Sequence, residues 1–161
     1  MALPIMQLEG RAKAYVGQIC DASLLDVLTG VCDDDVALGY LVDITEVKGD
    51  CYKVKILKDA AAGVAAKRPA FVARSHYDGR NAGPTFPAGL SFSMVETGRV
   101  WVVCSTTGIV AGAPVAIHAD SVIERAASAA DSIRGLTFTG RLGSTPGGGI
   151  VAEVQIRPQT A

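Results

Sequence analysis

The sequence predicts an all-β protein, a small β-barrel or β-sandwich with an extended N-terminal arm and one or two short helices. Three observations lead to this prediction. Apolar and polar residues alternate along several short segments, as they do in strands that bury one face. Glycine or proline separates most of these segments, which is typical of turns between short strands. A chain of 161 residues can bury one sizeable core, so a single β-rich domain is expected over residues 20–161.

The arm is expected over residues 1–19. Its apolar side chains follow no period, which favours an extended segment that packs on something else. These side chains are Leu3, Pro4, Ile5 and Met6. The alternative is a terminus that is disordered or packs on its own domain.

A short helix is predicted at residues 21–30, DASLLDVLTG. Asp or Ser can cap its start, and glycine ends it. The leucines between them, Leu24, Leu25 and Leu28, have helical spacing. Alternating segments follow at residues 36–44 and 51–57. The turn KGD at residues 48–50 joins them in a predicted hairpin, because Gly and Asp accept the tight backbone angles that a hairpin needs.

Six further segments predict strands, at residues 69–75, 90–96, 99–105, 113–119, 136–142 and 150–156. Thr97 and Gly98 separate the second of these from the third, and they predict a tight hairpin. In the third, Trp101 alternates with Val100 and Val102. This strand is therefore expected in the core, with Trp101 buried inside the domain or between protomers. Residues 120–134 favour a helix and a loop equally.

Composition excludes several classes of function. The formal net charge is -1, with 15 Lys and Arg against 16 Asp and Glu, so a nucleic-acid partner is not expected. No run approaches the roughly 20 apolar residues that cross a bilayer, and the N-terminus lacks the pattern of a secretory signal. We therefore expect no membrane partner and synthesis in the cytoplasm. No two of the four cysteines have metal-knuckle spacing, so we expect neither a metal nor a cofactor.

Catalysis is not expected either. Ser75, His76 and Asp78 resemble the members of a hydrolase triad, but near neighbours on one loop generally cannot converge as a triad must. A glycan- or receptor-binding β module exposed on a virion is a second alternative, with Trp101 or Tyr77 as a stacking platform.

The order of several segments resembles the cement, or head decoration, proteins of tailed bacteriophages. The sequence MALP is followed by DDDVALGYLV, then by PAGLSFSMVETGRVWVVCS and VAGAPVAIHAD, and finally by RGLTFTGRL, a glycine-rich turn and IVAEVQI. Two features depart from the family pattern: the C-terminal extension and the helix-like residues 120–134. The resemblance leaves open whether the fold is jelly-roll-like or tulip-like.

The resemblance implies a structural function without catalytic residues. Such a protein binds the outer surface of an expanded icosahedral head and bridges major capsid protein subunits against DNA pressure. It is expected on the virion after synthesis in the bacterial cytoplasm, as a homotrimer or alternatively a homodimer. The arm is then the expected capsid contact, through Leu3, Pro4, Ile5, Met6, Gln7 and Arg11.

Overall fold

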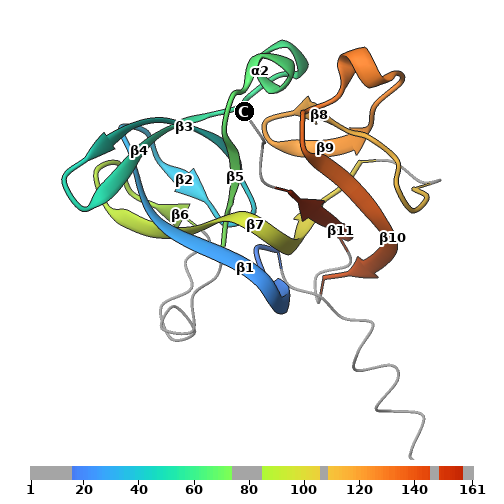
Figure 1. The fold of residues 1–161 in the computed structure, drawn as a ribbon, viewed down its shortest axis with the longest axis horizontal. Helices are drawn as coiled ribbons and strands as arrows, with labels where there is room; N and C mark the ends of the chain where they lie inside the picture. Colours follow the sequence, from blue (N-terminus) through green and yellow to red (C-terminus); the bar gives the residue numbers. More distant parts are fainter. Residues whose placement is uncertain (1–15, 74–84, 106–108, 146–148, 158–161) are drawn as a thin grey trace, which may run out of the picture.

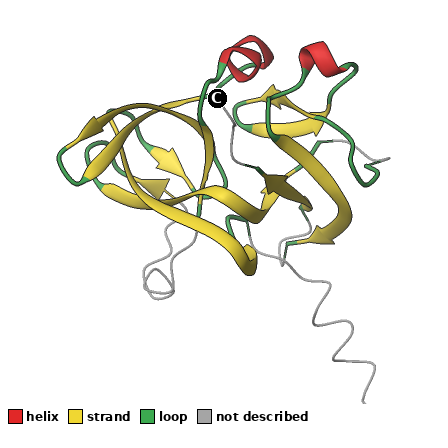
Figure 2. Ribbon diagram, in the orientation of Figure 1, coloured by secondary structure: helices red, strands yellow, loops and turns green. Residues whose placement is uncertain are grey.

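The computed structural model describes residues 16–73, 85–105, 109–145 and 149–157, with residues 21–24 described by their backbone alone. The described part is mostly strand, with a short α-helix and a turn of 3-10 helix (Figures 1 and 2), which confirms the all-β prediction. The strands are β1 (Ile19–Cys32), β2 (Val36–Ala37), β3 (Leu41–Lys48), β4 (Cys51–Ile56), β5 (Pro69–Val72), β6 (Thr85–Phe86), β7 (Ser91–Val103), β8 (Val115–Ala119), β9 (Val122–Arg125), β10 (Leu136–Ser144) and β11 (Ile150–Ile156). The helices are α2 (Ala60–Ala65) and η2 (Ala129–Asp131). Within the described part, no helix combines the length and apolar character needed to cross a membrane.

Five strands close a barrel in the order β1, β4, β3, β5, β7. The ring closes because β1 pairs with β4 along one edge and with β7 along the other. The β1–β4 pair is parallel, and the other pairs in the ring are antiparallel. Between a barrel and a sandwich, which the sequence left open, this part of the structure is a barrel.

Strand β7 continues beyond this barrel into a second group of strands, seen at the right of Figure 1. There it pairs with β11, which pairs with β10. A bridge from Pro114 to Thr137 connects β10 to the segment before the β8–β9 hairpin, and a bridge from Cys104 to Ile123 connects β9 back to the end of β7. Strand β7 is therefore shared by both parts of the fold.

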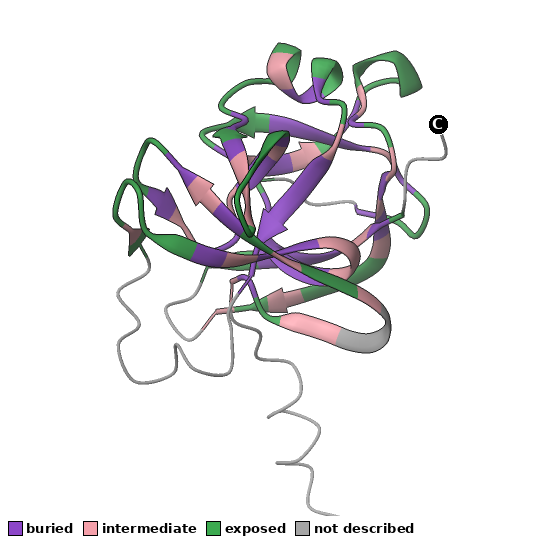
Figure 3. Cartoon of the chain, turned by 60° about the vertical axis from the view of Figure 1, so that its left-hand side comes forward, coloured by how far each residue is buried: buried purple, intermediate pink, exposed green. Residues whose placement is uncertain are grey.

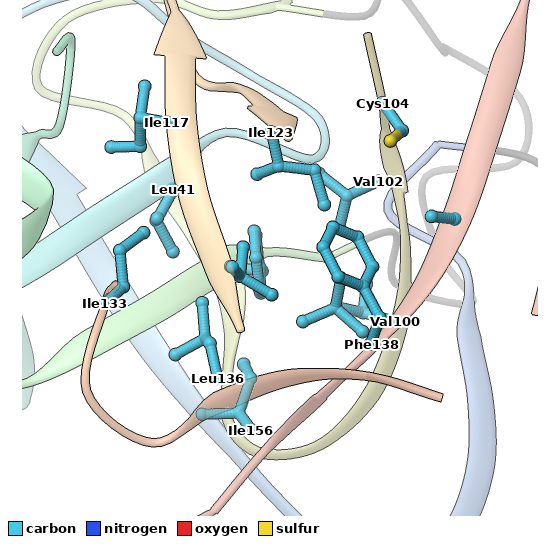
Figure 4. Close-up of a cluster of buried hydrophobic side chains, with 14 of the residues drawn as sticks. Leu41, Val100, Val102, Cys104, Ile117, Ile123, Ile133, Leu136, Phe138 and Ile156 are labelled. Carbon is cyan, nitrogen blue, oxygen red and sulfur yellow. The ribbon is translucent and has the colours of Figure 1, made fainter. Parts of the chain in front are cut away.

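Two buried clusters fill these two parts, and most of the buried residues lie on strands (Figure 3). The cluster inside the barrel includes Val42, Phe92 and Met94. The larger cluster lies against the second group of strands and includes Val100, Val102 and Phe138 (Figure 4). Neighbouring residues of β7 pack in different clusters because successive side chains of a strand point to opposite faces.

The hairpin predicted at Thr97 and Gly98 is wrong, because β7 is one continuous strand of 13 residues. Strand β5 pairs with β7 as far as Val95, and β11 pairs with the same side of β7 from Gly98 onward. Gly98 has φ 140°, a conformation that side chains other than glycine rarely adopt. The glycine therefore marks a change of partner strand, not a reversal of the chain.

The helix predicted at residues 21–30 is also wrong, because this segment belongs to β1. Pairing with β7, and with β4 at its C-terminal end, overrides the local leucine spacing. Register shifts between Ile19 and Val27 show that the segment is an irregular strand.

The helix alternative for residues 120–134 fails in the same way, since the segment contains β9 and the short η2. The helix that does form, α2, was not predicted. It begins at an Asp59 cap, whose carboxylate accepts a hydrogen bond from the Ala62 N–H at 2.7 Å. Its Gly63 lies against Ile117 and Ile133, where a Cβ atom would make contacts of 3.1 Å.

The hairpin predicted around residues 48–50 is confirmed by the antiparallel pairing of β3 with β4. The strand predicted at residues 36–44 is instead divided into β2 and the start of β3. Gly39 lies between them with φ 78°, which only glycine adopts readily. This turn brings the Gly39 N–H to the carbonyl of Val72 at 2.8 Å.

Candidate functional site

The predicted capsid contacts Leu3, Pro4, Ile5, Met6, Gln7 and Arg11 lie outside the described residues, so they remain predictions. The same is true of Ser75, His76, Tyr77 and Asp78. The description of the chain begins at residue 16. Residues 16–20, which include the end of the predicted arm, are called the arm root below.

The arm root lies along β7 and is fixed there at Trp101. The Gly17 N–H donates to the carbonyl of Trp101 at 2.8 Å, and the Trp101 N–H donates to the carbonyl of Gln18 at 3.0 Å. Ile19 is then in register with Val100. The root is thus attached to the strand that the two parts of the fold share.

The core strand predicted around Trp101 has its residues on two faces. Val100 and Val102 point into the larger buried cluster. Trp101 points away from it and packs with Val151, Val16 and Cys20. Because the arm root covers it, Trp101 is only 7% exposed, and the indole is not available as a glycan-stacking platform.

Next to Trp101 lies a fully buried carboxylate that the sequence pattern did not predict. Glu153 of β11 is in register with Trp101, and its side chain is 0% exposed. Its Oε2 accepts a hydrogen bond from Nη1 of Arg141 at 3.0 Å, while Oε1 has no hydrogen-bond partner among the described residues. The Arg141 guanidinium lies over the Trp101 ring, with 5.7 Å between its central carbon and the ring centroid.

Burial raises the pKa of the neighbouring Cys20 thiol well above its ordinary value, and the charge of Glu153 raises it further. Cys20 is therefore a packing residue that keeps its proton, and not a reactive thiolate. One sequence signal pointed to this region, namely an acid inside the apolar strand IVAEVQI. Alternation alone would place that acid in solvent, whereas in the structure it lies beside Trp101, Arg141 and Cys20 and is fully buried.

A groove of about 1050 Å³ opens where β7 changes partner. It is lined by Glu96 and Thr97 of β7, by β3 and by the chain that follows α2. Charges of both signs surround it, namely Lys67, Arg68, Arg134 and Arg157 with Asp26, Glu46 and Glu96. Such a groove can accept an extended peptide segment with charged side chains.

One ion pair spans part of this groove. Nε and Nη2 of Arg68 both donate to the Glu96 carboxylate, the second at 2.9 Å. The guanidinium also lies 5.0 Å from the centroid of the Tyr52 ring, and the hydrogen bond to Glu96 raises the pKa of Arg68. This fixed fork joins β7 to the residue before β5, which is a structural role.

The remaining polar clusters in the described part have local partners. The acidic turn before β2 is held by Asp33, 3.0 Å from the Lys53 ammonium, and by Asp35, which accepts from the Ala88 N–H at 2.9 Å. His118 pairs with Glu124 at 3.1 Å in the β8–β9 hairpin. Among the described residues, no three His, Cys, Asp or Glu side chains are arranged to hold a metal ion.

Comparison with known proteins gives the family. A family model described as "Structural cement protein (E217 gp24/Pam3 gp6)" matches residues 6–157. This chain belongs to the phage structural cement proteins. The match spans every described strand and helix, and it confirms the resemblance drawn from the sequence. The cement protein is accordingly a structural, capsid-associated phage protein whose partners are capsid proteins.

Among solved structures, the chain is similar to the N base of head fiber gp8.5 in bacteriophage phi29. The two share 12% sequence identity and superpose with a TM-score of 0.46, over 85% of this chain and 98% of that chain. No curated protein matches the chain.

Proposed function

We propose that this cement protein binds the outer surface of the expanded icosahedral head and bridges neighbouring major capsid protein subunits against DNA pressure. A bridge of this kind needs a rigid body and a contact fixed firmly to it. The observation that carries the proposal is the attachment of the arm root to Trp101 of β7, since β7 belongs to both parts of the fold. A pulling force on the arm would therefore act directly on β7, the strand that both parts of the fold share.

The arm is the proposed capsid contact, through Leu3, Pro4, Ile5, Met6, Gln7 and Arg11. Apolar residues in an extended segment can bury against a capsid surface, and the segment can add a strand to an exposed sheet edge. A ligand that binds only the expanded shell stabilises that state by mass action. Several contacts in one assembly add avidity. The family resemblance suggests a homotrimer at local threefold positions, with a homodimer as the alternative.

Deleting residues 2–9 tests the proposal. The shortened protein should fold normally, because residues 16–20 still attach to β7, but it should bind more weakly to expanded heads stripped of cement. Occupancy is measured by cosedimentation, and head stability by heat and osmotic shock. Equal occupancy by the shortened and full chains would remove the arm from the proposal. Stripped and decorated heads of equal resistance would overturn the stabilising function itself.

A further inference from the structure

We propose that Arg141 is a preorganised docking residue for a carboxylate of the capsid protein, and that buried Glu153 is the positioning residue that holds it. The inference rests on the proposed function, because it assumes a capsid surface as the partner. It adds a second capsid contact, made by the described domain, to the contact proposed for the arm.

The geometry presents Arg141 to solvent in a fixed orientation. Its side chain is 65% exposed although its partner Glu153 is fully buried. A guanidinium has five N–H donors, and among the described residues the Arg141 side chain donates one hydrogen bond, from Nη1 to Glu153. The Trp101 ring supports the guanidinium from one side. The donors that remain can bind a further acceptor.

Stability alone does not account for Glu153. Burying a carboxylate is costly, and apolar residues of similar volume often replace a buried ion pair without loss of stability. Here one carboxylate oxygen also lacks a hydrogen-bond partner among the described residues. A docking function accounts for the arrangement, because a side chain ordered before binding loses less conformational entropy on binding. Arginine is also among the residues enriched at interface positions of high binding energy.

The charge and the position of Arg141 indicate which group of the capsid protein would bind it. A guanidinium fork matches the two oxygens of a carboxylate, which it can bind with paired hydrogen bonds. The site adjoins the arm root, since Val16 and Cys20 pack on Trp101. An exposed apolar side chain lies nearby on the same face of the sheet, namely Val103 of β7, two residues after Trp101. A capsid segment with an acidic residue beside apolar ones would therefore contact the arm root and Arg141 together.

The test measures the dissociation constant for expanded heads stripped of cement. The double variant Arg141→Ala with Glu153→Leu removes both charges, so no unpaired buried charge remains, and it should bind about 30-fold more weakly. Glu153→Gln keeps the arginine but weakens its support, and should bind about 5-fold more weakly. Arg141→Lys keeps the charge without the fork, so its affinity should lie between those of the wild type and the double variant. Lys55→Ala, on an exposed position of β4, is the control and should bind as the wild type does.

A second experiment tests whether the group that Arg141 binds on the capsid protein is a carboxylate. Carbodiimide and an amine convert exposed carboxylates of the heads to amides, and on such heads the wild-type advantage over the double variant should disappear. A persistent advantage would overturn the carboxylate as partner. A double variant that is folded and binds within about two-fold of the wild type would overturn the docking role of Arg141. Glu153→Gln with wild-type affinity would overturn the positioning role. Failure of wild-type protein to bind heads would instead refute the proposed function.

Discussion

Replacing Arg141 by alanine should destabilise the protein more than an exposed position would suggest. The substitution leaves the fully buried Glu153 carboxylate without its ion-pair partner. Removing one partner of a fully buried pair costs about 3–5 kcal/mol. Here the arginine is 65% exposed, so water can replace part of the lost interaction, and we expect about 2 kcal/mol. For a domain of this size, that loss lowers Tm by about 4–8 °C.

The double variant with Glu153→Leu supplies the matched comparison. It removes the buried charge together with its partner, so its free energy of unfolding should lie within about 1 kcal/mol of the wild type. Urea unfolding can be followed by the fluorescence of Trp101, the single tryptophan, which lies against the altered pair. If Arg141→Ala and the double variant unfold at the same midpoint as the wild type, Glu153 is not a buried charge held by Arg141.

Three further predictions concern the core, the shared strand and the arm root. Phe138→Ala should lower the free energy of unfolding by about 3–5 kcal/mol, because the ring is 1% exposed; a loss below about 1 kcal/mol in urea unfolding would contradict this packing. Gly98→Val should cost about 1–3 kcal/mol, since φ is 140° there, and thermal unfolding with an unchanged Tm would refute the strain. The folded Cys20 thiol keeps its proton where the unfolded thiol loses it, so stability should fall as pH rises above 9.0. Cys20→Ser should remove this part of the pH dependence of the free energy of unfolding, measured by urea unfolding at a series of pH values. Identical pH profiles for the variant and the wild type would contradict the raised pKa of Cys20.

Alternation in the sequence was a reliable guide wherever a segment buries one face. The hairpin at residues 48–50 and strands β10 and β11 follow from it. Apolar residues at every second position indicate both an extended conformation and which face of the strand is buried. The errors occurred where long-range pairing outweighed local signals. The leucine spacing in β1 is helical, yet β7 and β4 hold the segment as a strand. The Thr97–Gly98 pair has hairpin chemistry, yet it lies within one continuous strand, which pairs with β5 before this point and with β11 after it.

The candidate site divides in the same way. The sequence identified Trp101 and the core strand, and it indicated an apolar arm ahead of the domain. It gave no indication that residues 16–20 cover Trp101, that Glu153 is fully buried, or that Arg141 reaches Glu153 from the neighbouring strand. The groove beside Glu96 was likewise invisible, because it arises from the place where β11 replaces β5.

The sequence by itself determined the all-β class, most strand positions and the family, because each depends on the local order of residue types. Only the tertiary structure decided which strand lies beside which, where the barrel closes and which charge is buried. The physical reason is that a residue's burial and ionic partners depend on segments far away along the chain. Arg141 and Trp101 lie 40 positions apart, and only the pairing of β7, β11 and β10 brings them together around Glu153.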